Sequence, residues 1–253
     1  TLTGYSDADC YEPDGFMIQN LKLAGSIKIA GYPVLTVDAG GVAAYVNNAR
    51  VTLSNIEVTE DFQINAGTYK YDYHNGKHST GGLIGRVVNN KQNLTIRNCK
   101  VSGTTGKPVS LTSLSHIGGF IGYVDLGSTD GELLIENTET DAAIDNLQLF
   151  STKEIAGAVV GYMYRGKLTI RGTENKPVTV QNTTVQGWWN VGGIVGETKE
   201  GVLVTGTYLT VKDTTLTSRK ATGGIIGEYG AYTAGTGSTL EHVKITDVKV
   251  QET

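Results

Sequence analysis

The sequence has little of what marks several common protein classes. Its 253 residues include only two cysteines, four prolines and four histidines. There is no long basic run, and the net charge is −4, so we expect no nucleic-acid partner. No stretch of about 18 apolar residues occurs, so we expect no membrane span in this region. Glycine, by contrast, is abundant, with 34 residues, and 16 of these recur in fixed positions of a repeat.

Seven segments share a pattern in which an apolar alternation breaks at one polar residue and then resumes. They read FMIQNLKL, VTLSNIEV, LTIRNCKV, LLIENTET, VTVQNTTV, LTVKDTTL and STLEHVKI, and they break at Asn20, Asn55, Asn98, Asn137, Asn182, Asp213 and His242. Alternation with period two is typical of a strand. Asn and Asp tolerate the left-handed backbone that a sharp turn requires, and stacked Asn side chains can hydrogen-bond. The pattern therefore predicts one column of polar corners.

A glycine-rich element precedes each of the last six breaking residues. It reads GGVAA at 40–44, GGLIG at 81–85, GGFIG at 118–122, GAVVG at 157–161, GGIVG at 192–196 and GGIIG at 223–227. A predicted strand follows each copy, whereas a phosphate-binding loop requires a helix N-terminus after its glycines. The glycines therefore indicate a bend that needs either a positive φ or a close approach of two backbone segments.

Together these elements predict an all-β fold, a right-handed single-stranded parallel β-helix (solenoid) of about seven rungs with an Asn corner ladder. Strands that recur at long, variable spacing and without two-residue turns are not hairpins, so each pairs with its copy one rung later. Right-handedness follows the general preference of crossover connections. We expect residues 1–15 to form an N-terminal cap segment and 16–253 the β-helix. The last segment lacks a polar cap, which predicts a longer protein.

The two cysteines do not predict a disulfide. Cys10 lies before the first rung and Cys99 lies in the third, about 10 Å along the stack at about 4.8 Å per rung. That separation is too large for a typical disulfide. Cys99 is expected to be a small core residue.

The glycine element followed by an (L/V)T(I/V)xN-type strand resembles the GLUG repeats of bacterial surface proteins. The resemblance covers roughly residues 37–250, and its clearest copies are 81–101, 118–140 and 192–216. GGVAA, GAVVG and the missing Gly-Gly before Asn20 depart from the pattern. The resemblance implies a secreted or wall-attached, adhesin-like protein. Such repeats also occur in large streptococcal immunoglobulin-A proteases, but the HExxH motif of a zinc protease is absent here.

Aromatic residues supply the candidate binding surface. The residues that follow the glycine elements are Tyr45, Arg86, Tyr123, Tyr162, Glu197 and Glu228. Alternation places them on the outer face at about 4.8 Å per rung, where aromatic rings can stack on sugars or anchor a protein partner. The candidate binding residues are Tyr45, Arg86, Tyr123, Tyr162, Tyr164, Trp188, Trp189, Tyr69, Tyr71 and Tyr73, the last three in the 60–79 insertion. The alternative is a tyrosine ladder that only stabilises the sheet.

We expect neither a cofactor nor a metal to be required. Asp7, Asp9, Glu12 and Asp14 form an acidic cluster that could hold Ca²⁺, although its spacing does not match an EF-hand loop. His74 and His78 are four residues apart in a predicted loop, and we expect both to be solvent-exposed and not zinc ligands.

These observations predict a non-catalytic extracellular module of a bacterial cell-surface or secreted protein. It would act as an adhesin-like binder of a host glycan, a host protein or a cell-wall component, or as a structural spacer.

The rival hypothesis is a carbohydrate-active enzyme of the pectin-lyase-like class. Glu136 and Glu139 would share one coil, with Arg97 and Lys100 one rung below, and glycoside hydrolysis requires two carboxylates on one face. Opposite charges on neighbouring rungs also pair merely to stabilise a sheet surface, and we favour that interpretation.

Overall fold

The computed structural model describes residues 2–3, 15–29, 37–66, 78–90, 92–141, 143–199, 201–230 and 237–252. Every regular element in these ranges is a β-strand, which confirms the all-β prediction. No helix that could cross a membrane is found in the described part of the chain. Cys10, the acidic cluster and most of the predicted N-terminal cap lie outside the described residues.

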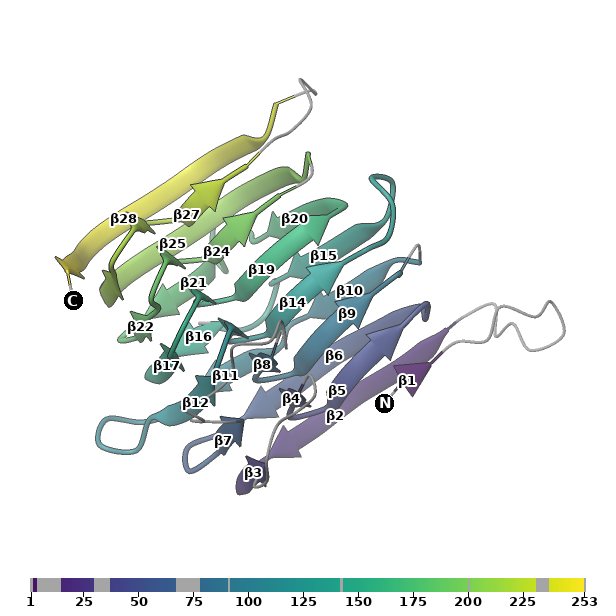
Figure 1. Cartoon of the computed structure of the whole chain (residues 1–253), viewed down its shortest axis with the longest axis horizontal. Helices are drawn as coiled ribbons and strands as arrows, with labels where there is room; N and C mark the ends of the chain where they lie inside the picture. Colours follow the sequence, from purple (N-terminus) through teal and green to yellow (C-terminus); the bar gives the residue numbers. More distant parts are fainter. Residues whose placement is uncertain are drawn as a thin grey trace, which may run out of the picture.

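The strands form three sheets, and the paired strands of each sheet run parallel to one another (Figure 1). The seven-stranded sheet contains β1 (Leu2–Thr3), β5 (Ala43–Asn47), β9 (Ile84–Val88), β14 (Ile121–Asp125), β19 (Val160–Arg165), β24 (Val195–Thr198) and β27 (Ile226–Tyr229). The six-stranded sheet contains β4 (Asp38–Gly40), β8 (Ser79–Gly81), β13 (His116–Gly118), β18 (Ile155–Gly157), β23 (Asn190–Gly192) and β26 (Ala221–Gly223).

The third and largest sheet has fifteen strands. They are β2 (Phe16–Leu23), β3 (Ser26–Ile29), β6 (Val51–Val58), β7 (Gln63–Ala66), β10 (Leu94–Arg97), β11 (Lys100–Ser102), β12 (Val109–Ser113), β15 (Glu132–Glu136), β16 (Ile144–Asp145), β17 (Leu147–Ser151), β20 (Lys167–Arg171), β21 (Val178–Gln181), β22 (Thr184–Gln186), β25 (Leu203–Ser218) and β28 (Thr239–Glu252). Several short strands of this sheet are separated only by a corner, and in β25 and β28 they merge into one long strand.

The chain visits the three sheets repeatedly in one order. From β8 it passes to β9, then through β10, β11 and β12, and then to β13, which pairs with β8. One such passage is called a circuit below. Each strand therefore pairs with the corresponding strands of the preceding and following circuits, and along the seven-stranded sheet the strands lie in chain order. The sequence analysis predicted this parallel pairing of each strand with its copy in the next repeat.

The polar corners of the large sheet form two columns, whereas the sequence predicted one. By register, the first column contains Asn20, Asn55, Asn98, Asn137, Gly172, Tyr208 and His242. The Asn55 side-chain amide donates to Oδ1 of Asn20 at 3.2 Å, so the expected hydrogen bonding along the column is present there. Tyr208 and His242 continue the column with stacked rings whose centroids lie 4.5 Å apart.

The second column contains Gly103, Asn146, Asn182, Asp213 and Asp247. The assignment of Asn182 and Asp213 to the first column was therefore wrong. Both residues do adopt the expected left-handed backbone, with φ of 48° and 47°. The two columns follow the same kind of apolar alternation, so the local sequence pattern alone does not distinguish them.

The repeated glycines allow two backbone segments to approach closely at the bend between the six-stranded and seven-stranded sheets. None of the glycines in these elements has a positive φ, so close approach is the property that matters. A methyl group on Gly118 would overlap the carbonyl oxygen of Ile121, and one on Gly122 would lie 2.6 Å from the backbone nitrogen of Thr80. The second contact shows that β14 lies close to the neighbouring circuit's strand of the six-stranded sheet.

The inward-facing apolar residues form one continuous core. In β6, Val51, Leu53, Ile56 and Val58 are all fully buried, while the residues between them are partly or fully exposed. Cys99 belongs to this core, as predicted, and its Sγ donates to the carbonyl oxygens of Leu53 at 3.6 Å and Arg97 at 3.4 Å. Burial raises the pKa of the Cys99 thiol to about 11.

Gly118→Ala is expected to lower the free energy of unfolding by at least about 2 kcal/mol, because the added methyl group has no room beside Ile121. Gly237→Ala is the matched control, since nothing lies within 4 Å of its would-be Cβ. The control should change stability by less than about 0.5 kcal/mol. Urea unfolding of both variants measures the difference, and equal effects would contradict the close-approach argument.

Cys99 is expected to be unreactive in the folded protein. With a pKa raised from 9.0 to about 11, it carries about 100-fold less thiolate at a given pH than an ordinary thiol. In a Cys10→Ser variant, where Cys99 is the only thiol, a chromogenic disulfide reagent at pH 8 should label the native protein very slowly. The same protein in denaturant should react at once, and rapid native labelling would show that Cys99 is accessible.

Candidate functional site

Two adjacent tryptophans stand on the turn that joins β22 to β23. Trp188 and Trp189 are 42% and 49% exposed, which is unusual for side chains of this size. This turn leads from the large sheet to the six-stranded sheet, and the corresponding turns of neighbouring circuits lie on either side of it. We call this surface the tryptophan corner, defined by Trp188, Trp189 and the residues that flank them, Thr152, Lys153, Glu154, Arg219 and Lys220.

Backbone hydrogen bonds hold the tryptophan corner in place from both sides. The backbone N–H groups of Trp188 and Trp189 both donate to the carbonyl oxygen of Glu154, each at 2.9 Å. On the other side, the N–H of Arg219 donates to the carbonyl oxygen of Trp188 at 3.1 Å, and the N–H of Lys220 to that of Trp189 at 3.3 Å. The tryptophans are therefore carried by a braced turn, so their backbone needs little ordering when a ligand binds.

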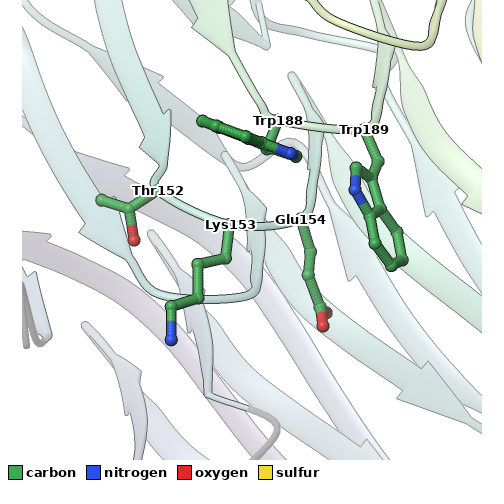
Figure 2. A pocket seen from close by; sticks show the side chains of 5 residues that line it. All are labelled: Thr152, Lys153, Glu154, Trp188 and Trp189. Carbon is green, nitrogen blue, oxygen red and sulfur yellow. The ribbon is translucent and has the colours of Figure 1, made fainter. Parts of the chain in front are cut away.

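A hollow of about 270 Å³ lies at this corner. It is lined by Thr152, Lys153, Glu154, Trp188 and Trp189 (Figure 2). Figure 2 shows the Trp188 ring above the other side chains, with Trp189, Glu154 and Lys153 extending to one side of the ribbon. Aromatic faces beside a few polar groups are the usual composition of a small-ligand site.

Charged side chains surround the hollow, and most of them are paired. The Arg219 guanidinium carbon lies 3.6 Å from the centroid of the Trp188 ring, a cation–π arrangement that orders both side chains. Lys220 contacts Glu228 at 2.7 Å, and Lys199 contacts Glu228 at 3.1 Å. The hydrogen bond from Lys220 and the nearby Lys199 charge lower the pKa of Glu228 to about 2.

The carboxylate of Glu154 connects the hollow to a buried aromatic cluster. Its Oε2 lies 3.2 Å from Nε2 of His116, which is only 3% exposed. The His116 ring packs against Tyr162 and Tyr123 at centroid distances of 4.9 and 5.3 Å. Glu154 is therefore held in place by a group inside the fold.

The tyrosine column has the predicted register but not the predicted exposure. Tyr45, Arg86, Tyr123, Tyr162, Glu197 and Glu228 are paired in successive strands of the seven-stranded sheet. Tyr123 and Tyr162, however, are each only 7% exposed, so the expectation of a solvent-exposed stripe was wrong for them. Tyr45, Arg86 and Tyr164 are partly exposed.

The burial of this column follows from the glycine bend. Because the bend is tight, the outer faces of the two sheets turn toward each other, and their side chains meet across the angle. His116 of the six-stranded sheet reaches Tyr123 and Tyr162, and Asp38 of the same sheet contacts Arg86 at 3.0 Å. The alternation rule correctly gave the outer face, but it does not show that another sheet covers that face.

The Asp38–Arg86 pair is the most buried ion pair of this angle between the sheets, with the two side chains 12% and 13% exposed. Arg86 also donates to the Ser79 hydroxyl at 3.1 Å, and its guanidinium lies 5.0 Å from the Tyr123 ring centroid. Burial raises the pKa of Asp38 to about 6, although the Arg86 charge acts in the opposite direction.

The remaining predicted site residues have different outcomes. Tyr69, Tyr71, Tyr73 and His74 lie outside the described residues. His78 was expected to be exposed, but it is 1% exposed and its Nδ1 accepts a hydrogen bond from the N–H of Val37 at 3.1 Å. Among the described residues, no group of three or more potential metal ligands is found.

The carboxylates proposed for the enzymatic alternative lie in ion pairs or in another hollow. Glu136 is held between Arg97 at 2.9 Å and Arg171 at 3.6 Å. Glu139 lines a separate polar hollow of about 460 Å³, together with Lys100 and others. Lys100 itself contacts Glu57 at 2.9 Å. These contacts agree with the interpretation that opposite charges pair between circuits.

Sequence reasoning found Trp188 and Trp189 but missed Lys153, Glu154, Arg219 and His116, which complete the site. Their turns differ in sequence, and only the register between circuits places them together. Comparison with known proteins found no matching family model, no similar curated protein and no similar solved structure. The tryptophan corner combines two exposed aromatic rings with a hollow lined by polar side chains, an arrangement suited to binding a ligand.

Titration of Asp38 is expected to reduce stability as the pH rises. Its pKa of about 6 in the folded state exceeds the ordinary value of 3.8, so the folded state binds the proton more tightly than the unfolded state. Relative to Asp38→Asn, the native protein should lose on the order of 2 kcal/mol between pH 4 and pH 7. Urea unfolding at both pH values measures this, with Asp130→Asn at a highly exposed carboxylate as the control. A difference that does not vary with pH would contradict the raised pKa.

Proposed function

We propose that this chain is a non-catalytic carbohydrate-binding module that presents the tryptophan corner on a right-handed parallel β-helix of about seven rungs. The observation that carries the proposal is the pair of exposed tryptophans beside a hollow of about 270 Å³. Binding requires a preformed surface of this kind. Unlike glycoside hydrolysis, it does not require two carboxylates that are free to act on a substrate.

The arrangement of the three sheets supports the proposed architecture. All three consist of parallel strands, and corresponding strands of successive circuits pair in register. Two columns of corners run up the stack, and the apolar residues of every circuit join one core. A solenoid of this kind offers an extended, rigid surface for binding.

A saccharide is the ligand class that fits the corner best. The flat face of an indole ring packs against the C–H face of a pyranose, and its burial there removes apolar surface from water. Glu154, Lys153 and Thr152 lie beside the rings, where carboxylate, ammonium and hydroxyl groups can bond sugar hydroxyls. The hollow is small and shallow in shape, as expected for one or two sugar rings and not for a folded protein domain.

The setting of the module is proposed from the repeat. The resemblance to GLUG repeats supports a bacterial cell-surface or secreted protein, with adhesin-like attachment to a host glycan or a cell-wall polysaccharide. Pectin-lyase-like catalysis is the less favoured function, because Glu136 is already held by two arginines. At a bacterial cell surface the same chain also serves as a spacer that holds the tryptophan corner away from the cell.

Trp189→Ala is expected to weaken saccharide binding by about 1–3 kcal/mol, because it removes an exposed aromatic platform without disturbing the core. A glycan array with the native protein identifies the ligand, and titration calorimetry compares the variants. Phe150→Ala is the matched control, since Phe150 is 40% exposed and does not line the hollow. If Trp189→Ala binds every ligand as tightly as the native protein does, the corner is not the binding site.

A further inference from the structure

The tryptophan corner is bordered by cations from three successive circuits. Lys153 precedes it on one side, and Arg219 and Lys220 follow it on the other, although the chain as a whole has a net charge of −4. Trp188 and Arg219 occupy the same position in neighbouring turns, as do Trp189 and Lys220. These three cations form a rim beside the aromatic surface, which also contains the carboxylate of Glu154.

The carboxylates near this rim are already paired. Glu154 contacts His116 at 3.2 Å, and Glu228 contacts both Lys220 and Lys199. Arg219 differs from the other cations, because in the described part of the chain no carboxylate lies within ion-pair distance of it. Its charge is not neutralised by the protein surface around it.

The stacking of Arg219 on Trp188 leaves its hydrogen-bonding edge usable. The guanidinium carbon lies 3.6 Å from the ring centroid and the Arg219 side chain is exposed, so the guanidinium contacts the ring and solvent at the same time. A guanidinium presents its N–H groups in the plane of the fork, where they match a carboxylate or sulfate with two parallel hydrogen bonds. Arg219 is thus an exposed cation in contact with an exposed aromatic ring.

Resting on the proposed function, we propose that the tryptophan corner selects acidic saccharides, in which a carboxylate or sulfate group binds Arg219 while a sugar ring stacks on the exposed tryptophans. Lys153 lines the hollow itself and adds a second cation in the turn of the preceding circuit. Lys153 and Arg219 belong to turns two circuits apart, or about 10 Å at strand spacing. An acidic oligosaccharide of at least two sugar units therefore fits better than a single sugar.

The test uses three probes of equal length: a hexamer of galacturonate, a sulfated hexasaccharide and neutral cellohexaose. Calorimetry at low salt should show that the native protein binds at least one acidic probe about 10-fold more tightly than the neutral probe. The advantage should shrink as salt is added, because charge attraction is screened. The relative affinity of the two acidic probes distinguishes carboxylate from sulfate recognition.

Arg219→Gln should reduce binding of the preferred acidic probe about 10-fold and weaken cellohexaose binding much less, because a neutral sugar is affected only by the loss of the contact between Arg219 and Trp188. Arg219→Lys, which keeps the charge but loses the planar fork, should retain part of the preference. Arg171→Gln is the control for loss of an exposed arginine elsewhere on the surface. Lys153→Gln supplies a second, independent loss of charge at the corner, and thermal unfolding verifies that each variant is folded.

The outcomes separate this inference from the proposed function. If the native protein binds the three probes equally, or if Arg219→Gln and Lys153→Gln both leave the acidic preference intact, the inference is overturned while sugar binding stands. If Trp189→Ala changes no binding, the proposed function fails as well. If neither acidic probe binds, the acidic-saccharide assignment is wrong.

Discussion

The close approach of backbone segments at the glycine bend is the constraint on which the rest of the structure depends. At Gly118 and Gly122 there is no space for even a methyl group. The resulting tight angle brings the outer faces of two sheets together, so it creates both the Asp38–Arg86 ion pair and the His116–Tyr123 contact. A looser bend would leave those side chains in water and remove the partner that holds Glu154.

The candidate site occupies an exposed turn that is braced by its neighbours. Its backbone is hydrogen-bonded to the turns above and below, so its side chains are free to vary while their positions stay fixed. Trp188 and Trp189 exploit this arrangement, since their large rings are exposed without the conformational freedom of a long loop. The core contributes to function only indirectly, by keeping the spacing between circuits constant.

Sequence analysis predicted strands in the seven corner segments and at the glycine elements, their parallel pairing, and the register of the column from Tyr45 to Glu228, because these depend on local alternation and on the repeated glycines. It did not predict strands such as β12, β17 and β20. It did not separate the two corner columns, because Gly172 and Tyr208 replace the expected Asn in one of them. It also predicted that Tyr123 is exposed. Alternation shows on which face of a strand a side chain lies, but it does not show that the six-stranded sheet covers that face. The partners Arg219 and Glu154 were missed since they meet Trp188 only through register between circuits.

The alignment of equivalent turns has a consequence for specificity. Trp188 and Arg219 occupy equivalent positions in neighbouring circuits, about 4.8 Å apart at strand spacing, and Lys153 lies in the corresponding turn of the circuit before them. All three side chains lie at least partly at the surface, and none of them belongs to the core. Under the proposed function, substitutions at these positions would change which ligand groups the surface binds and would leave the spacing between circuits unchanged.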